Sequence, residues 1–232
     1  MIFRLDGTNT TLFPRPDLAE PDGLLAVGGD LSPERLIAAY TLGIFPWFSE
    51  PPYLWWSPDP RFVLLPENLH ISRRLRRVVR SGRFTFSHNR DFAAVCQACA
   101  KSPRPGQKGT WLTPEMHTAY STLYTLGLVH SFETWRGGEL VGGMYGVCLG
   151  RAFFGESMFY READASKAVL AVFAEWFFHL GGHFIDCQQE TPHMARFGAV
   201  SLPRHDFLAR LRLAVAEEPE KGPNFPGSSR QK

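Results

Sequence analysis

Residues 163–188 read ADASKAVLAVFAEWFFHLGGHFIDCQ, and this stretch decides the fold. Apolar side chains recur at helical spacing as far as Leu180, and the two glycines that follow are typical of a helix end. HFIDCQ then alternates as a buried strand does. A helix that leads directly into a strand is typical of the crossover between two parallel strands. We therefore expect the strand that starts at His183 to pair in parallel with a neighbour.

Three consecutive strands precede this crossover, and further helices surround it. Together they predict an α/β protein (α+β overall), in which a mixed sheet carries helices on its faces. The predicted strands are Val129–Trp135, Glu139–Leu149 and Arg151–Phe159, with Arg83–Ser87 upstream. The predicted helices are Glu34–Tyr40, Ile71–Arg80, Asp91–Ala100, one that starts at Thr113, Pro192–Phe197 and Arg204–Ala216.

The composition, 44% hydrophobic with 19 Phe and 6 Trp among 232 residues, is sufficient for a large buried core. We expect two domains, a small N-terminal one at residues 1–61 and a larger one at 62–232 with a loose tail from about residue 217. No apolar run approaches the roughly 18 residues of a membrane span, and no export signal is visible, so we expect a soluble cytoplasmic protein. Cys96 and Cys99 form one C-x2-C pair without a second, which favours packed thiols over a metal site.

Two polar residues interrupt the strand HFIDCQ. Strict alternation would place Asp186 and Gln188 on one face of the sheet, with their Cα atoms roughly 6.5 to 7 Å apart. Ligands of such sheets bind where strands end or separate. We therefore expect both side chains to point into a ligand site.

The charge of the chain is unevenly distributed. Residues 70–112 hold ten basic residues and one acid, Asp91, whereas residues 1–69 hold four basic residues and nine acids. Because so few acids are available to pair with these basic residues, a polyanionic partner is favoured, although a solvated helix face is the alternative. The basic residues are Arg73, Arg74, Arg76, Arg77, Arg80, Arg83, Arg90, Lys101, Arg104 and Lys108.

Nine ordered blocks of the sequence closely resemble the leucyl/phenylalanyl-tRNA-protein transferase family. They span roughly residues 12–210 and read DGLLAVGGDLSPERLIAAY, GIFPWF, LWWSPDPRFVL, LHISRRLRR, GTWLTPEM, LVGGMYGV, FFGESMF, ASKAV and FIDCQ. The resemblance implies a GNAT-like large domain and a small separate N-terminal domain. It also implies transfer of Leu, Phe or Met from an aminoacyl-tRNA to the α-amine of proteins that begin with Arg or Lys, which marks them for N-end-rule degradation.

The chemistry of the side chains suggests roles for Gln188, Asp186, Glu156 and the arginines, and the resemblance implies the position of the catalytic pair, the donor pocket and the two tryptophans. Gln188 would orient the attacking amine, and Asp186 would hold the positive charge that develops on its nitrogen. Glu156 would hold the ammonium of the donor, hold the basic side chain of the acceptor, or be a structural acid. A donor side-chain pocket would be lined by Met144, Phe153, Phe173, Phe177 and Ile185. Trp47 and Trp111 would stack on the terminal adenosine, and the tRNA backbone would be bound by Arg73, Arg74, Arg76, Arg77, Arg80 and Arg83.

Two other functions stay open at this point. One is a CoA-dependent GNAT N-acetyltransferase, which is disfavoured because SMFYREADASKAV lacks the glycines that cradle a pyrophosphate. The other is a non-catalytic tRNA-binding module, which would leave Asp186 and Gln188 unexplained. An aminoacyl-tRNA is already an activated ester, so we expect no cofactor and no metal. We also expect a monomer.

Overall fold

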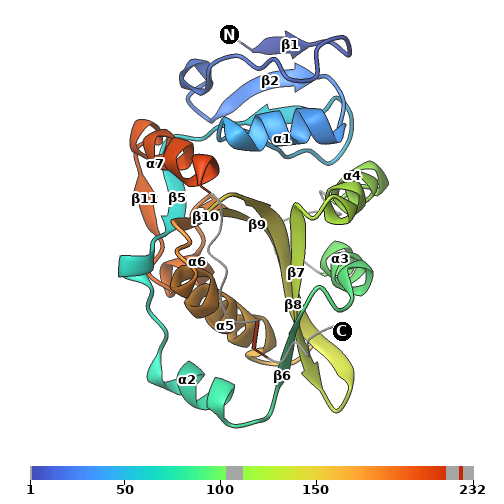
Figure 1. Cartoon of the computed structure of the whole chain (residues 1–232). Coiled ribbons are helices and arrows are strands. Elements are labelled where there is room, and N and C mark those ends of the chain that lie inside the picture. Colours follow the sequence, from blue (N-terminus) through green and yellow to red (C-terminus); the bar gives the residue numbers. More distant parts are fainter. Residues whose placement is uncertain (1, 103–111, 218–224, 227–232) are drawn as a thin grey trace.

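A four-stranded sheet forms the N-terminal part of the protein. The computed structural model describes residues 2–102, 112–217 and 225–226. In this first sheet the strand order is β1-β2-β4-β3, and α1 (Pro33–Thr41) lies beside it at one end of the molecule (Figure 1). The strands are β1 (Phe3–Leu5), β2 (Leu24–Gly28), β3 (Phe45–Pro46) and β4 (Leu54–Trp56), and short 3-10 helices lie at Pro16–Leu18 and Pro66–Asn68.

A seven-stranded mixed sheet forms the rest of the fold, in the order β11-β5-β10-β9-β8-β7-β6. The crossover prediction is confirmed, since β10 pairs in parallel with β9 while the other pairings are antiparallel. The strands are β5 (Arg61–Leu64), β6 (Thr85–His88), β7 (Val129–Arg136), β8 (Glu139–Leu149), β9 (Ala152–Tyr160), β10 (Phe184–Gln188) and β11 (Val200–Leu202).

Helices cover both faces of this sheet, which confirms the α/β class. In Figure 1, α5 (Ala165–His179) and α2 (Arg73–Arg80) lie on one side of the strands, and α3 (Phe92–Lys101) and α4 (Pro114–Thr125) lie on the other. The remaining helices are α6 (Pro192–Ala195) and α7 (Arg204–Ala216). Side-chain oxygens cap the N-termini of α1, α2, α3 and α4, by accepting a backbone N–H at Ser32, Ser72, Asp91 and Thr113.

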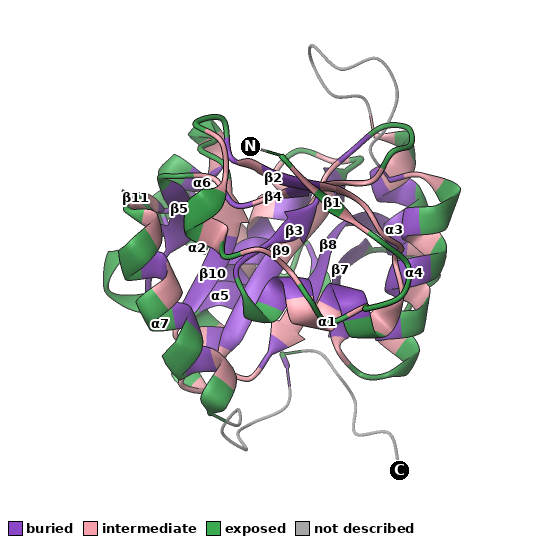
Figure 2. Ribbon diagram, turned by 90° about the horizontal axis from the view of Figure 1, so that it is seen from above, coloured by how far each residue is buried: buried purple, intermediate pink, exposed green. Residues whose placement is uncertain are grey.

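Two hydrophobic cores result, one on each face, because adjacent strand residues point in opposite directions. Phe153 and Ile185 belong to the core under α5, whereas Phe154 and Phe184 belong to the core under α1, α3 and α4. Figure 2 shows the buried strands at the centre, with exposed positions on the outer sides of the helices. The core under α1 runs without interruption from the small sheet to the large one. The division of the chain at residue 61 therefore stays a prediction.

Several strands were missed by the sequence reasoning. In β5 all four residues are buried, so the strand lacks the alternation that reveals a half-exposed one. The strands β3 and β4 lie in the proline-rich segment, where only two and three residues respectively are extended. Arg104, Lys108, Trp111 and most of the predicted tail lie outside the described residues.

Candidate functional site

A cavity of about 520 Å³ lies where β9 and β10 separate. The parallel pairing ends with the pair Asp186 and Phe154, although β9 continues to Tyr160 and β10 to Gln188. The cavity is lined by Met144, Tyr145, Gly155, Glu156, Ser157, Met158, Leu170, Ile185, Asp186, Cys187, Gln188, Thr191, His193 and Met194. Strand separation thus leaves a cavity in the sheet, and Asp186 and Gln188 both line it.

One wall of the cavity is apolar. Of the five residues predicted for a donor side-chain pocket, Met144 and Ile185 line this wall. The other three, Phe153, Phe173 and Phe177, are buried in the same hydrophobic cluster and are absent from the lining. The ring centroids of Phe153 and Phe173 are 4.4 Å apart, and those of Phe173 and Phe177 are 5.4 Å apart in a stacked arrangement. The phenylalanines therefore form an aromatic layer in the same hydrophobic cluster as Met144 and Ile185.

The opposite wall carries Glu156 between two tyrosine hydroxyls. Tyr40 donates to Oε1 of Glu156 at 2.7 Å, Tyr120 donates to Oε2 at 2.6 Å, and the two hydroxyl oxygens are 2.8 Å apart. The pKa of Glu156 is raised to about 7, chiefly by burial; the charge of Asp186 also raises it, whereas the two tyrosine hydrogen bonds lower it. Burial also raises the pKa of both tyrosines, so their hydroxyls stay protonated.

Three oxygen–oxygen contacts link Glu156, Tyr40 and Tyr120 in a closed ring. The two hydroxyls supply two protons, so an ionised Glu156 leaves the tyrosine–tyrosine contact without a hydrogen, whereas a protonated Glu156 supplies the third. The geometry and the raised pKa therefore agree that this carboxyl exchanges a proton near neutral pH. Tyr40 and Tyr120 were missed by sequence reasoning, because a tyrosine on a buried helix face has the same pattern as a core residue.

Asp186 is fully buried and paired with Arg61. Two parallel hydrogen bonds join Nε to Oδ1 at 2.8 Å and Nη2 to Oδ2 at 2.7 Å. A third guanidinium bond reaches the carbonyl of Gly43 at 3.1 Å, and the rings of Phe45 and Phe207 each lie 4.7 Å from Cζ. The guanidinium therefore compensates the charge of Asp186. Nothing in the sequence near Arg61 indicates this role.

Gln188 does not continue the alternation of β10. Its φ is +58°, and the pairing of β10 with β5 shifts register between Asp186 and Gln188, which marks a β-bulge. The N–H of Gln188 donates to Oδ1 of Asp186 at 2.9 Å. The expectation that strict alternation sets the positions of both side chains is therefore wrong, because the bulge re-aims Gln188. The two residues still line the same cavity and are linked directly through the backbone.

Of the two tryptophans predicted to stack on adenosine, only Trp47 lies within the described residues. Trp47 is partly exposed, and its ring meets that of Trp56 edge-on at 5.7 Å. Trp56 in turn donates to the carbonyl of Trp47 at 2.7 Å, and Trp55 is buried, so these two tryptophans pack within the protein. Trp111 lies outside the described residues.

Several arginines in and just after α2 form ion pairs with acidic residues, although few acids lie near them in the sequence. Arg74 pairs with Asp164, Arg76 with Glu175, and Arg83, just beyond the helix, with Glu162. The acids come from α5 and from the segment before it, far along the chain. The inference from so few neighbouring acids therefore does not hold for these three of the six arginines. The other three are exposed and make no ion pair within the described part of the chain: Arg73, Arg77 and Arg80.

The four cysteines are free thiols, and Cys96 and Cys99 are buried in α3. Within the described ranges, no group of three His, Cys, Asp or Glu side chains could hold a metal ion. Cys187 lines the cavity, where burial raises its pKa. None of the helices described is both long and apolar enough to cross a membrane.

Comparisons with known proteins agree over most of the chain. A sequence model described as leucyl/phenylalanyl-tRNA protein transferase matches residues 63–212, and one described as the N-terminal domain of the same transferase matches residues 29–59. A leucyl/phenylalanyl-tRNA–protein transferase of Anaeromyxobacter sp. (strain Fw109-5) is 58% identical over 88% of this chain and 87% of its own. One of Myxococcus xanthus (strain DK1622) is 52% identical over 95% of each.

Similarity to solved structures is much weaker. A GCN5-related N-acetyltransferase-like protein from Streptococcus suis aligns with a TM-score of 0.35 and 11% identity, over 69% of this chain and 59% of that chain. A structure described as L-PGS from Bacillus licheniformis also aligns with a TM-score of 0.35, at 14% identity over 70% of this chain and 51% of that chain. Alignments at this level support no argument about function.

Proposed function

The chain belongs to the leucyl/phenylalanyl-tRNA protein transferase family and is therefore an aminoacyltransferase of the N-end rule, and we propose that the cavity between β9 and β10 is its reaction site. Its substrates are an aminoacyl-tRNA and a protein. One observation carries the proposal of the site. A single cavity combines an apolar wall, the carboxyl of Glu156 with a pKa of about 7, and Gln188 on a bulge.

The apolar wall suits the donor side chain. Leu, Phe and Met are large, apolar and unbranched at Cβ, and they fit a slot between Met144 and Ile185. The layer of Phe153, Phe173 and Phe177 in the same hydrophobic cluster limits its depth. Hydrophobic pockets separate similar side chains by only about 1–3 kcal/mol, which suits an enzyme with more than one donor.

The reaction is the attack of an amine on an ester. A C–N bond forms, the C–O bond to the terminal ribose breaks, and the proton that leaves nitrogen ends on the ribose oxygen. A peptide α-amine has a pKa near 8, so having it neutral at pH 7 costs only about 1.4 kcal/mol. Correct positioning of the reactants contributes about 7–11 kcal/mol. Positioning therefore matters more than the strength of a base.

Gln188 orients the nucleophile in this proposal. Its amide oxygen accepts a hydrogen bond from the attacking amine and directs the lone pair of nitrogen at the ester carbon. Asp186 holds the bulge that presents Gln188, because its Oδ1 accepts the N–H of that residue. Arg61 already compensates the charge of Asp186, so we assign Asp186 a positioning role in place of charge stabilisation.

Glu156, in place of Asp186, interacts with the positive charge of the acceptor amine. It is a carboxyl of the cavity without an ion pair in the described chain, and its pKa of about 7 lies close to that of the amine. In its ionised form it attracts the acceptor ammonium and accepts its proton, with Tyr40 and Tyr120 fixing both oxygens. The proposal also includes a preference for acceptors that begin with Arg or Lys and the stacking of Trp47 and Trp111 on adenosine. It further includes a monomeric state and a cytoplasmic location.

A transfer assay tests this function. The protein is given labelled Phe-tRNA or labelled acetyl-CoA together with a reporter that begins with Arg, and a matched reporter that begins with Gly. We expect label from Phe-tRNA on the first reporter alone. Label from acetyl-CoA would support an acetyltransferase, and binding of tRNA without any transfer would support a non-catalytic module.

A further inference from the structure

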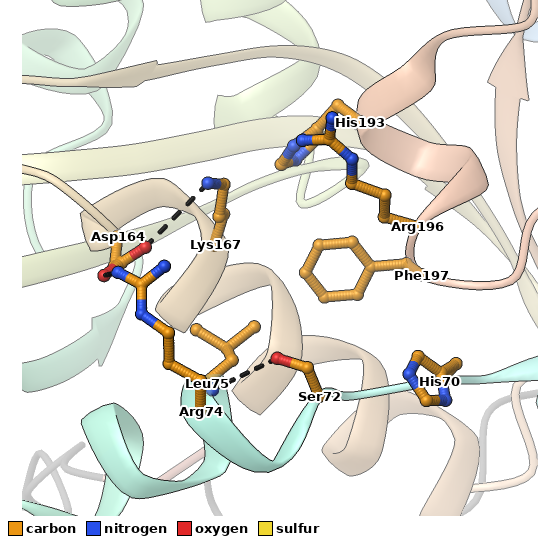
Figure 3. Close-up of a pocket in the computed structure, with 9 residues that line it drawn as sticks. All are labelled: His70, Ser72, Arg74, Leu75, Asp164, Lys167, His193, Arg196 and Phe197. Atoms are coloured by element: carbon orange, nitrogen blue, oxygen red, sulfur yellow. Dashed lines mark hydrogen bonds and ion pairs between the residues drawn. The ribbon is translucent and has the colours of Figure 1, made fainter.

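A second cavity, of about 360 Å³, lies between the start of α2, the start of α5 and α6 (Figure 3). Figure 3 shows Arg74, Asp164 and Lys167 on one side of it and His193 with Arg196 on the other. Its lining residues are His70, Ser72, Arg74, Leu75, Asp164, Lys167, His193, Arg196 and Phe197. Three permanent cations thus face one carboxylate.

The ion pairs leave this cavity positively charged. Asp164 contacts Arg74 at 2.5 Å and Lys167 at 3.8 Å, so one carboxylate serves both cations. Arg196 is exposed and makes no ion pair with any residue that the structure describes. Two positive charges are therefore in excess, which favours an anionic ligand.

His193 offers an unused hydrogen-bonding atom at the same place. Its Nε2 is buried and has no hydrogen-bond partner in the described structure. Burial, reinforced by the charges of Lys167 and Arg196, lowers the pKa of His193, so the ring is neutral at pH 7. A buried polar atom without a partner costs about 1–3 kcal/mol, and a bound ligand would remove that cost.

The walls of the cavity are held rigidly together. The N–H of His70 donates to the carbonyl of Phe197 at 2.8 Å, which ties the segment before α2 to the end of α6. Gly198 has a φ of +93°, and any side chain there would collide with the carbonyl oxygen of Asn68. The basic groups are therefore presented by a fixed frame.

The position of the cavity indicates which anion it takes. His193 also lines the reaction cavity between β9 and β10, so the two cavities share a wall. On its other side the cavity adjoins α2, which carries the exposed Arg73, Arg77 and Arg80. A polyanion that contacts α2 and ends in the reaction cavity would pass this point.

We propose that this cavity binds an internucleotide phosphate of the single-stranded 3′ end of the donor tRNA, immediately before the aminoacylated nucleotide, through Lys167, Arg196 and His193. The inference rests on the proposed reaction site. Charge-assisted hydrogen bonds from Lys167 and Arg196 hold the phosphate oxygens. The contact carries no base specificity, and it places the ester at a fixed depth in the reaction cavity.

Two donors of different length test the proposal. One is 3′-phenylalanyl-adenosine, which has no phosphate, and the other is a phenylalanyl-CCA trinucleotide, which has two internucleotide phosphates. We expect Lys167→Gln and Arg196→Gln each to raise KM for the trinucleotide about tenfold, with kcat and the KM for phenylalanyl-adenosine unchanged. With full tRNA, each variant should also make the salt dependence of binding shallower, by about 0.7 in the slope per lost contact.

The control is Arg210→Gln, an exposed arginine of α7 that lines neither cavity. Equal losses with both donors would overturn the inference, as they would show a general effect on the reaction cavity. Unchanged KM for the trinucleotide would overturn it as well. If Gln188→Gly transfers from phenylalanyl-adenosine at the normal rate, the proposed reaction site itself is wrong, which separates that failure from this one. Arg196 is exposed, so its replacement does not threaten folding.

Discussion

Arg61 and Asp186 lie 125 positions apart in the chain, and their side chains meet in two parallel hydrogen bonds of 2.8 and 2.7 Å where neither is exposed to water. The pair joins β5 to β10, and through the carbonyl of Gly43 it also ties the large sheet to the segment after α1. A charge pair buried this deeply is a structural element as well as a neighbour of the reaction site.

Removal of one partner should destabilise the fold strongly. We expect Arg61→Ala to lower the free energy of unfolding by about 3–5 kcal/mol, because it leaves the carboxylate of Asp186 buried without a compensating charge. Urea unfolding followed by circular dichroism measures the loss. The matched control is Arg15→Ala, whose pair with Asp17 is largely exposed and should contribute about 0–1 kcal/mol. Similar losses in the two variants would contradict a special role for the buried pair.

Gln188 should matter for the rate of transfer and little for stability. Gln188→Gly removes the side chain but keeps the N–H that donates to Asp186. Glycine also adopts the φ of +58° at this position without strain. We expect unfolding to change little, because relief of backbone strain offsets the greater entropy of the unfolded chain. Single-turnover transfer from Phe-tRNA should slow about 100-fold, as the amine is no longer directed.

The exposed neighbour Gln189 provides the control for this variant. Gln189→Ala removes an amide that does not line the cavity, so transfer should be unchanged. A normal rate in Gln188→Gly at saturating substrates would exclude the orienting role. A large loss of stability in that variant would show that the side chain supports the bulge itself.

Local signals account for what the sequence could predict. The helix over residues 163–180, the two glycines and the strand HFIDCQ are contiguous, so the parallel pairing of β10 with β9 followed from one stretch. Positions 144 and 185 could be assigned to an apolar site only through resemblance to a family, because Met and Ile in strands have the pattern of core residues.

Long-range partners account for what could not be predicted. Tyr40 lies 116 positions from Glu156, and nothing near either residue indicates their hydrogen bond. The bulge at Gln188 depends on the register with β5, a strand that has no alternation of its own. Likewise Glu162, Asp164 and Glu175 pair with arginines about 80 to 100 positions away, so counting charges along residues 70–112 overstated the free positive charge.

The pKa of Glu156 gives a prediction for pH. The ionised carboxylate attracts the acceptor ammonium, so transfer should fall as the pH drops through about 7. In Glu156→Gln the rate should be lower, and the inflection near pH 7 should be absent. The dependence is measured from single-turnover rates between pH 5.5 and 8.5. An inflection near pH 7 that persists in Glu156→Gln would assign it to another group.

The same pKa predicts the sign of a stability change. Folding raises the pKa of this carboxyl from the ordinary 4.5 to about 7, so the folded protein binds the proton more tightly than the unfolded chain. The free energy of unfolding should therefore decrease as pH rises from 4.5 to 7, and Glu156→Gln should flatten this decrease. Glu67→Gln, at an exposed position, is the control and should leave the profile unchanged.

The arginines of α2 and of the segment just after it should divide into two groups in tRNA binding. Arg77 and Arg80 are exposed and without an ion pair in the described chain, whereas the guanidinium of Arg83 is committed to Glu162 at 3.0 Å. Each contact with a phosphate of duplex RNA contributes roughly 0.9 to the slope of log affinity against log salt, on the scale known for DNA. We expect Arg77→Ala and Arg80→Ala each to weaken binding and to reduce this slope by about that amount.

Arg83→Ala is the matched control, since it removes the same charge from a side chain that already has an acidic partner. Its effect on the slope should be smaller than that of Arg80→Ala, because a phosphate would have to displace Glu162 to reach it. Equal slopes in all three variants would show that the ion pairs in the free protein do not decide which arginines bind RNA. An unchanged slope in Arg77→Ala and Arg80→Ala would leave α2 as a solvated basic face, and the path of the tRNA would have to lie elsewhere.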